Sequence, residues 1–253
     1  MKGVVYTCIT GGYDSLLRPA PSPLLDSFDF ICFTGTANLN ADGPEGSAAG
    51  SSTSESRFRE ARHESSGPWR LLELDPQSLP EEALRSNSLL SRYPKLQPHK
   101  LLGGYDFSLW VDGNIELLDD SLLKAALECA GKGVKYAGVP HPSRSDIFQE
   151  ARMCHKMKLI DLRTLLRVDL RCFMGGIRRG SGLLENNIIF RRHNDPDIIA
   201  LDNIWWDSIL HLAPRDQLSL MLCLRRCGVR PEFLLGEGLN SRNHPGLKYL
   251  RHK

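Results

Sequence analysis

Residues 107–114 read Phe-Ser-Leu-Trp-Val-Asp-Gly-Asn, a strongly apolar run that ends at an acid, a glycine and an amide. Such a run, closed by a turn signal, predicts a buried β-strand over Phe107–Val111. Gly113 permits a tight turn and lets a ligand approach the backbone closely. The carboxylate of Asp112, with or without the amide oxygen of Asn114, suits a hard divalent cation that could bridge a diphosphate. Asp-Gly-Asn is equally good turn chemistry, so a purely structural turn is an even alternative.

Short runs rich in β-branched and aromatic residues predict further strands on both sides of this one. They lie at Val4–Ile9, Phe28–Phe33, Trp69–Leu74, Lys135–Val139 and Asn187–Phe190. Segments with helical periodicity or helix-start signals lie at Pro80–Leu90, Tyr93–Leu102, Ser121–Ala130, Asp161–Phe173, Asp195–Leu210 and Arg215–Cys227. Strands that alternate with helices predict a single α/β domain over residues 1–253, with a mainly parallel sheet flanked by helices. Ligands of such sheets bind beyond the carboxyl ends of the strands.

One segment, at about residues 35–68, departs from this pattern. Its centre, residues 41–52, contains no large apolar side chain. A segment of this composition buries too little surface to offset the entropy of ordering it. We therefore expect a flexible surface loop there.

Composition narrows the class of protein. The chain has 253 residues, 41 % hydrophobic and 25 % charged, with a formal net charge of +2, which indicates an ordinary globular domain and no nucleic-acid partner. Seven cysteines without a CxxC pair argue against a disulfide framework and a zinc ribbon. The chain shows neither a signal-peptide pattern nor an apolar run of about 20 residues. These features predict a cytoplasmic protein without a transmembrane segment, for which peripheral membrane contact stays open.

Two other polar segments follow predicted strands. Thr10-Gly11-Gly12-Tyr13-Asp14 follows the first strand, where the glycines would let a base or ribose lie on the backbone, Tyr13 would stack on the base and Asp14 would accept from a hydroxyl. His141-Pro142-Ser143-Arg144 follows another strand, and Arg144 would give a planar clamp for phosphate or sugar hydroxyls. A bare turn is the alternative for each segment.

Further candidates come from other parts of the chain. Lys95 and Lys100 precede the Asp112 strand, and either could neutralise phosphate. Glu185 precedes the predicted strand at Asn187 and is the best-placed carboxylate of the second half for an acceptor hydroxyl. Arg215-Asp216-Gln217 opens a very apolar helix, so Asp216 either favours the helix N-terminus electrostatically or lines a pocket. His244 and Lys248 near the end could bind a cation and a phosphate, or belong to a frayed tail.

Five of these segments occur in a fixed order along the chain. They are Tyr6-Thr7-Cys8-Ile9-Thr10-Gly11-Gly12-Tyr13-Asp14, Trp110-Val111-Asp112-Gly113-Asn114, His141-Pro142-Ser143-Arg144, Gly182-Leu183-Leu184-Glu185-Asn186 and Arg215-Asp216-Gln217. Together they resemble the glycosyltransferase-like domain shared by bacterial polysaccharide-associated proteins and plant mucilage- and turgor-related proteins. The resemblance covers nearly the whole chain outside residues 35–68.

The resemblance implies a GT-A-like, Rossmann-related fold and a nucleotide-sugar donor, most simply a UDP-sugar. It implies that the donor is bound by Thr10, Gly11, Gly12, Tyr13, Asp14, Lys100, Asp112, Asn114, His141, Arg144 and Lys248. Glu185, Asp216 and Gln217 would face the acceptor or the reaction centre.

The resemblance also implies a metal ion. Many GT-A enzymes hold manganese with an Asp-x-Asp motif, and here Asn114 stands where the second carboxylate usually does. The tail is similar to the His-x-x-Gly-x-x-Lys element of glycogenin-like enzymes, with a shorter spacing. We therefore expect Mn²⁺ or Mg²⁺ at Asp112, Asn114 and His244.

The expected function is transfer of a sugar from a nucleotide-sugar, of UDP type, to a glycan or lipid-linked acceptor in surface polysaccharide synthesis. The alternative is a non-catalytic glycan- or nucleotide-binding module with a degenerate metal site, which the amide at Asn114 keeps open. A nucleotidyltransferase is less favoured, because no early glycine-rich segment with a following Arg and Lys is present.

Overall fold

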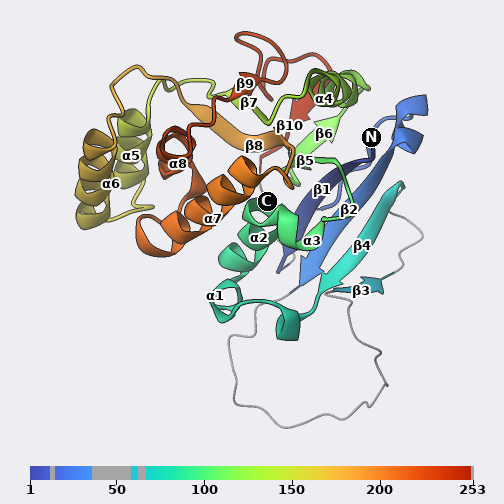
Figure 1. Ribbon diagram of the computed structural model, residues 1–253, viewed down its shortest axis with the longest axis horizontal. Helices are drawn as coiled ribbons and strands as arrows, with labels where there is room; N and C mark the ends of the chain where they lie inside the picture. Colours follow the sequence, from blue (N-terminus) through green and yellow to red (C-terminus); the bar gives the residue numbers. More distant parts are fainter. Residues whose placement is uncertain (12–14, 36–57, 62–66, 252–253) are drawn as a thin grey trace.

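The computed structural model describes residues 1–11, 15–35, 58–61 and 67–251, and its centre is one twisted sheet (Figure 1). In these residues eight strands pair in the order β3-β4-β2-β1-β5-β8-β7-β9. Their bounds are β1 Gly3–Thr10, β2 Phe28–Gly35, β3 Phe58–Ala61, β4 Trp69–Leu74, β5 Phe107–Val111, β7 Tyr136–Pro140, β8 Leu184–Arg191 and β9 Glu232–Phe233. A second, two-stranded sheet pairs β6 Ile115–Leu117 with β10 Leu247–Tyr249.

The main sheet is mostly parallel, as the sequence predicted. The pairs β1–β2, β2–β4, β1–β5 and β7–β9 are parallel, whereas β8 is antiparallel to both β5 and β7, and β3 is antiparallel to β4. Six of the eight described strands therefore run in one direction. The reversed direction of β8 brings its first residues to the edge where the parallel strands end.

The helices cover both faces of the sheet. Their bounds are α1 Glu81–Leu84, α2 Asn87–Leu96, α3 Pro98–Leu101, α4 Ser121–Lys132, α5 Ile147–Lys156, α6 Leu162–Met174, α7 Pro196–His211 and α8 Leu220–Arg226. Short 3₁₀ turns are η1 Pro23–Ser27, η2 Pro76–Ser78 and η3 Asp216–Leu218. No helix in the described ranges has both the length and the apolar character needed to cross a bilayer.

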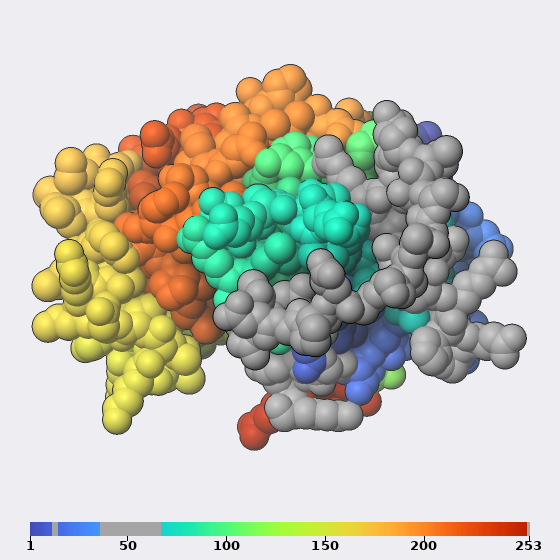
Figure 2. Space-filling model, turned by 90° about the horizontal axis from the view of Figure 1, so that it is seen from below, coloured from blue at the N-terminus to red at the C-terminus, as the bar shows by residue number. Residues whose placement is uncertain are grey.

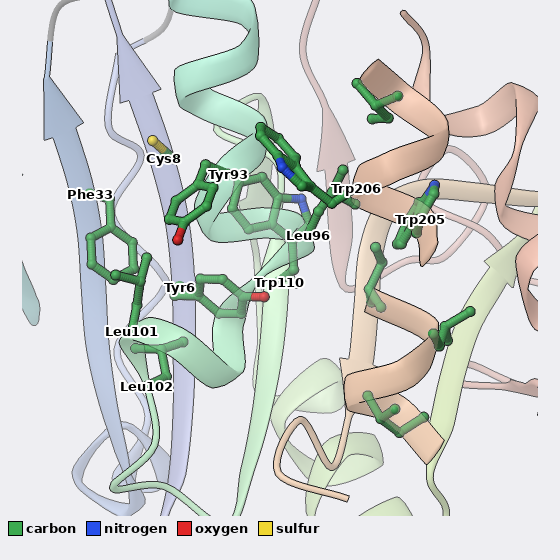
Figure 3. Close-up of a cluster of buried hydrophobic side chains, with 14 of the residues drawn as sticks. Tyr6, Cys8, Phe33, Tyr93, Leu96, Leu101, Leu102, Trp110, Trp205 and Trp206 are labelled. Carbon is green, nitrogen blue, oxygen red and sulfur yellow. The ribbon is translucent and has the colours of Figure 1, made fainter. Parts of the chain in front are cut away.

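Alternate residues of β1 feed two separate cores, because successive strand side chains point to opposite faces. Val4 and Tyr6 join the core under α2, α7 and α8, whereas Val5 joins the core under α4. Figure 3 shows the first core, in which Tyr93 and Leu96 of α2 lie between the sheet and the tryptophans of α7. This packing fixes α2 over the sheet, and α2 is the helix that brings the main cation to the site.

Helix α2 combines the end of the predicted segment Pro80–Leu90 with the start of the predicted segment Tyr93–Leu102. Ser86 caps it, with its Oγ accepting from the Leu89 amide at 3.1 Å. Pro94 lies inside the helix, although proline in a helix interior usually marks a break. The buried contacts of Tyr93 and Leu96 hold this turn against the sheet and α7. Lys95 therefore belongs to the last turn of α2.

The predicted helix over Arg215–Cys227 is divided into η3 and α8. Ser219 separates the two, with a φ of −134° outside the helical region, and its hydroxyl donates to the Asp216 carbonyl at 3.3 Å. The segment is nevertheless buried as predicted, through Leu218, Leu220 and Leu224. The division turns the first residues of η3 toward the edge of the sheet.

Most of the predicted loop at about 35–68 lies outside the described residues. Within it the structure describes Gly35, the short strand β3 and the turn at 67–68. Strand β3 pairs with β4 at the edge of the sheet and is a finding that the sequence did not predict.

Candidate functional site

A cavity of about 590 Å³ lies at the edge of the sheet where the parallel strands end. Its walls come from the ends of β1 and β5, the start of β8, one side of α2 and the 3₁₀ turn η3. This volume falls within the roughly 300–1,000 Å³ typical of small-ligand pockets. The position is the one expected for ligands of α/β sheets.

Lys95 lies between two carboxylates in this cavity. Its Nζ is 3.3 Å from Asp112 Oδ1 and 2.9 Å from Asp216 Oδ2, and it stands 5.3 Å from the centre of the Trp110 ring. Trp110 Nε1 also donates to Asp112 Oδ1 at 2.6 Å. The Arg92 guanidinium lies one helical turn back, 4.0 Å from Asp216 Oδ1. Side chains from α2, β5 and η3 thus form one charged cluster.

Burial and charge act in opposite directions on this cluster. Burial favours the neutral form of each group, but Asp112 and Asp216 outweigh it at Lys95, so the pKa of Lys95 is raised. Burial likewise opposes the charged form of Asp216, but Lys95 and Arg92 hold its pKa well below the usual 3.8. Both groups are therefore charged throughout the neutral pH range.

A buried ion pair beneath the cavity fixes the backbone of Lys95. Arg191 of β8 donates through Nη1 to Asp202 Oδ1 at 2.6 Å, through Nη2 to the Tyr6 hydroxyl at 3.1 Å, and also to the Lys95 carbonyl. Gln97 Nε2 donates to the Asp202 carbonyl at 2.8 Å. These hydrogen bonds hold the end of α2 against β8 and α7. The backbone from which the Lys95 side chain extends is therefore fixed.

Three polar residues occupy the buried start of β8 and face the cavity. Glu185 accepts from Ser241 Oγ at 3.2 Å and from Arg242 Nη1. Asn187 Nδ2 donates to the same Ser241 hydroxyl at 2.7 Å. Asn186 is 4 % exposed, and neither polar atom of its side chain has a hydrogen-bond partner in the described structure. A buried amide without a partner beside a cavity is available to hydrogen-bond a ligand.

Asn186 gives a first testable prediction. Asn186→Ala should weaken binding of the cavity's ligand roughly tenfold, because one or two ligand hydrogen bonds are lost. The free energy of unfolding without ligand should stay the same or rise slightly, since an unsatisfied buried amide is removed. Calorimetric titration with UDP and a denaturant melt on one preparation measure both quantities. Loss of stability with unchanged UDP affinity would make Asn186 a structural residue.

The start of the predicted nucleotide segment lies where expected. Thr10 and Gly11 line the cavity, and Thr10 Oγ1 donates to the Asn87 carbonyl at 2.9 Å. Gly11 has a φ of 60°, a conformation that favours glycine, and a Cβ there would lie 2.7 Å from Asn87 Nδ2, so the Asn87 side chain would have to shift. Gly12, Tyr13 and Asp14 lie outside the described residues.

The η3 residues present their side chains to the cavity. No side-chain capping hydrogen bond forms at the N-cap of η3, which is Arg215, and the Asp216 carboxylate lies against Lys95 and Arg92. Gln217 lines the cavity and donates through Nε2 to the Leu184 carbonyl at 3.3 Å. Of the two interpretations open for Asp216, the pocket-wall interpretation fits these contacts.

The His141–Arg144 turn contacts α5, the helix that follows it. His141 Nδ1 accepts from the amides of Ser143 and Arg144, at 3.1 and 3.0 Å. Arg144 Nε donates to the buried Glu150 of α5, which also lies 3.8 Å from His141 Nε2. The cavity lining that the structure describes includes neither His141 nor Arg144. The Arg144 guanidinium is bound by Glu150 outside this lining, so the predicted sugar contacts of His141 and Arg144 stay a prediction.

His141 gives a prediction about pH. Burial, reinforced by the Arg144 charge, lowers its pKa from 6.5 to about 4. A lowered histidine pKa means that the unfolded chain binds the proton more tightly, so stability is present above pH 6.5 and falls as the pH drops toward 4. His141→Asn keeps an acceptor for the two amides and removes the titration.

Urea denaturation of both proteins between pH 7.5 and pH 4.5 checks this expectation, with the range chosen to span roughly the normal histidine pKa. The wild-type protein should lose more stability over that range than His141→Asn. Parallel curves for the two proteins would show that the imidazole does not carry the pH dependence.

The geometry can now be compared with known proteins. The family described as "TOD1/MUCI70, glycosyltransferase-like domain" matches residues 1–236. The chain belongs to the TOD1/MUCI70 family. Comparison with curated proteins gives no match. Among solved structures the chain is similar to mouse xyloside xylosyltransferase 1 in its apo form, with a TM-score of 0.44 and 8 % identity over 92 % of this chain and 84 % of that one.

The metal ligands predicted for this TOD1/MUCI70 domain do not come together. Asn114 bonds to the Leu250 carbonyl at one end of the β6–β10 pair, whereas Gly246, beside His244, bonds to Leu118 at the other end. Four residues of extended chain separate these ends by about 13 Å. Across the described residues no three His, Cys, Asp or Glu side chains are grouped to hold a metal ion.

Asp112 itself is already bonded to cationic and N–H donors. Its Oδ1 accepts hydrogen bonds from the Lys95 ammonium and from the Trp110 indole N–H. In this arrangement the Lys95 ammonium lies beside the carboxylate, at the position predicted for the cation. The metal site stays a prediction.

Two predicted lysines also lie elsewhere. Lys100 belongs to the separate helix α3 and is exposed, and Lys248 pairs with Glu116 across the small sheet at 3.1 Å. Neither is among the described residues that line the cavity. Lys95 takes the position that the sequence analysis gave to Lys100.

Five lining residues of the TOD1/MUCI70 cavity were not singled out from the sequence. They are Asn87, Ser88, Ser91, Arg92 and Tyr249. Arg92 and Lys95 are three residues apart, which places both on one side of α2, and this spacing was the available signal. Nothing comparable indicates Tyr249, because it reaches the cavity through the pairing of β10 with β6.

Proposed function

We propose that this protein transfers a sugar from a nucleotide-sugar, of UDP type, to a glycan or lipid-linked acceptor, in the synthesis of surface polysaccharide. Membership of a glycosyltransferase-like family supports the reaction class. The observation that carries the proposal is the Lys95 ammonium held at the carboxyl edge of the sheet, between Asp112 and Asp216. A fixed cation in a partly enclosed cavity is suited to the diphosphate of such a donor.

The cavity offers separate regions for the parts of the donor. Thr10 and Gly11 supply a close backbone approach for the nucleoside. Lys95, Arg92 and Arg215 supply positive charge for the diphosphate, since all three line the cavity and the charge on the departing diphosphate must be stabilised. The donor sugar and the acceptor hydroxyl then face Glu185, Asp216 and Gln217 across η3 and β8.

Positively charged side chains stabilise the negative charge of the leaving diphosphate. The described residues contain no group of three His, Cys, Asp or Glu that could hold a metal ion, and Lys95 lies directly against Asp112. A metal ion, when bound, would supply the same countercharge, so the test below is run in both conditions.

Release of UDP from a panel of UDP-sugars, with and without manganese, tests the proposal. Turnover of at least one donor that rises with added glycan acceptor is expected. Lys100→Met serves as a matched control, because it removes an exposed lysine outside the described cavity lining. No donor turnover under any condition, with UDP still bound, would overturn the catalytic assignment.

That last outcome corresponds to a second candidate function, a non-catalytic glycan- or nucleotide-binding module. One observation favours it. The carboxylates Asp112 and Asp216 are both paired with Lys95, and Glu185 is paired with Arg242, so each lining carboxylate named here already has a cationic partner. A general base must accept a proton in the transition state, and a strong ion pair opposes that. UDP binding without turnover would identify this module.

A further inference from the structure

Large apolar side chains are exposed mainly in one part of the molecule. The described residues contain eleven of them, and eight lie between residues 153 and 174. They are Met153, Met157, Leu159, Leu162, Leu166, Leu170, Phe173 and Met174. Single exposed apolar residues are common on soluble proteins, but a contiguous group marks an interaction surface. We call this group the α5–α6 patch.

Helix α6 is apolar on two opposite faces. Val168 and Cys172 point inward and are completely buried against α5 and η3. Leu162, Leu166 and Leu170 repeat every four residues and are each more than half exposed. A surface helix that only packs on its own core needs one apolar stripe, so the second stripe is available to another surface.

A row of arginines borders the exposed stripe. These are Arg163, Arg167 and Arg171. Each directly follows a leucine of the exposed stripe in the sequence, and all three are exposed. Residues 147–179 contain eight Lys and Arg against three Asp and Glu, a net +5, whereas the whole chain is +2. The rest of the chain is therefore −3, and the excess positive charge of the molecule is concentrated around the patch.

The patch lies at one end of the molecule. Figure 1 shows α6 as the outermost element, with α5 between it and the rest of the fold. Figure 2, from a second direction, shows the same segment in yellow as a protrusion at that end. A flat surface can therefore reach the patch without meeting the rest of the body.

We propose that the α5–α6 patch binds the surface of a bilayer rich in anionic lipid, with α6 lying in the plane of the interface. Leucine, methionine and phenylalanine side chains enter the boundary between headgroups and acyl chains, and the bordering arginines contact lipid phosphate. A second copy of this chain is a poorer occupant, because two patches of net +5 repel each other. The charge of the patch is complementary to an anionic surface.

This surface is connected to the site through η3. Leu218 of η3 belongs to the same buried cluster as the inner face of α6, and Asp216 and Gln217 of η3 line the cavity. The membrane proposal does not depend on the proposed function, but it is consistent with an acceptor that is lipid-linked.

Sedimentation with phosphatidylcholine vesicles, with and without phosphatidylglycerol, tests the proposal on the full chain. The wild-type protein should bind the anionic vesicles and lose binding at high salt. The variant Arg163→Gln, Arg167→Gln, Arg171→Gln should bind roughly 10²-fold more weakly. The variant Leu166→Ser, Leu170→Ser, Phe173→Ser should lose a similar or larger factor.

Matched controls remove equivalent side chains elsewhere. Leu118→Ser with Phe233→Ser removes two exposed apolar residues outside the patch, and Arg226→Gln with Arg230→Gln removes two exposed charges. Both should bind vesicles like the wild-type protein, and every variant should keep its melting temperature and UDP affinity. Equal vesicle binding by the patch variants and the controls would overturn the proposal, as would a wild-type dimer that the Leu variant dissociates. UDP affinity reports on the cavity separately, so the two proposals can fail independently.

Discussion

Lys95→Met should lower donor turnover by roughly 10²- to 10³-fold, the range seen when one preorganised stabiliser of a developing negative charge is removed. The physical reason is the position of its ammonium, 2.9 Å from Asp216 and 3.3 Å from Asp112, at the edge where a diphosphate would lie. Without the ammonium, the attraction between Lys95 and the diphosphate is lost. The carboxylates of Asp112 and Asp216 then repel the negatively charged leaving group. UDP release from the best donor of the panel measures the change.

The same substitution should also destabilise the fold. Removing one partner of a buried ion pair leaves its counter-charges unpaired, at a cost of about 3 kcal/mol or more. For a chain of this length that corresponds to a fall in Tm of roughly 10 °C. Lys95→Arg is therefore made alongside, because it keeps the charge and separates loss of folding from loss of chemistry.

Lys100→Met is the matched negative control for Lys95→Met. Both substitutions remove one lysine from neighbouring helical segments, but Lys100 is exposed in α3. Turnover and Tm should both be close to those of the wild-type protein. If Lys95→Met and Lys100→Met turn over donor equally well, the cavity at Lys95 is not the donor site.

The contrast between these two lysines shows where sequence reasoning reaches its limit. The segment Lys95-Leu96-Gln97-Pro98-His99-Lys100 offers two cations five residues apart, and nothing local distinguishes them. The distinction comes from Arg191 and Asp202, almost a hundred residues away, which fix the Lys95 carbonyl and the end of α2. Long-range contacts of this kind leave no periodic signal.

The strands were easier to predict than the residues that follow them. β5 and β4 begin and end where the sequence predicted, because buried parallel strands are short apolar runs closed by turns. Helix α7 was also predicted, through Pro196 at its first position. The predicted strand Asn187–Phe190 begins three residues later and ends one residue earlier than β8, since Glu185 and Asn186 are polar residues in a fully buried strand.

The residues predicted to bind a metal ion lie apart in the structure for a related physical reason. Asp112 and Asn114 are adjacent in sequence, but Asn114 turns to Leu250 while Asp112 turns to Lys95. The His244 end of β10 is paired with Leu118, and the order of residues alone does not give that register. The antiparallel direction of β8, which brings Glu185 to the cavity, was likewise not readable, because it depends on the path of residues 141–183.

Asp216→Asn should lower donor turnover by roughly 10²-fold while the protein remains folded. A helix cap would tolerate this change, because asparagine caps about as well as aspartate. The N-cap position of η3 is Arg215, however, and the Asp216 carboxylate contacts Lys95 and Arg92 within the cavity. The substitution keeps the shape of the side chain and removes the charge that holds the Lys95 ammonium in place.

The pH dependence of this variant separates a positioning role from a general base. Lys95 and Arg92 outweigh burial and hold the pKa of Asp216 well below 3.8, so the carboxylate stays ionised at neutral pH. An aspartate with a lowered folded pKa stabilises the fold above its unfolded pKa, and that contribution is lost as the pH falls through the folded value. The stability difference between wild type and Asp216→Asn should therefore be constant at neutral pH and shrink only below about pH 4.

An ordinary aspartate is roughly fully ionised between pH 5 and 8. Over this range the turnover of the wild-type protein should show no rise with pH that is absent from Asp216→Asn. Asp207→Asn is the control, since Asp207 is a largely exposed acid on α7 that pairs with His211. Melting temperature and turnover are measured on one preparation of each protein. Wild-type turnover by Asp216→Asn would remove Asp216 from the reaction centre, and Glu185, held by Arg242 and Ser241 on the opposite wall, would then be the carboxylate to test.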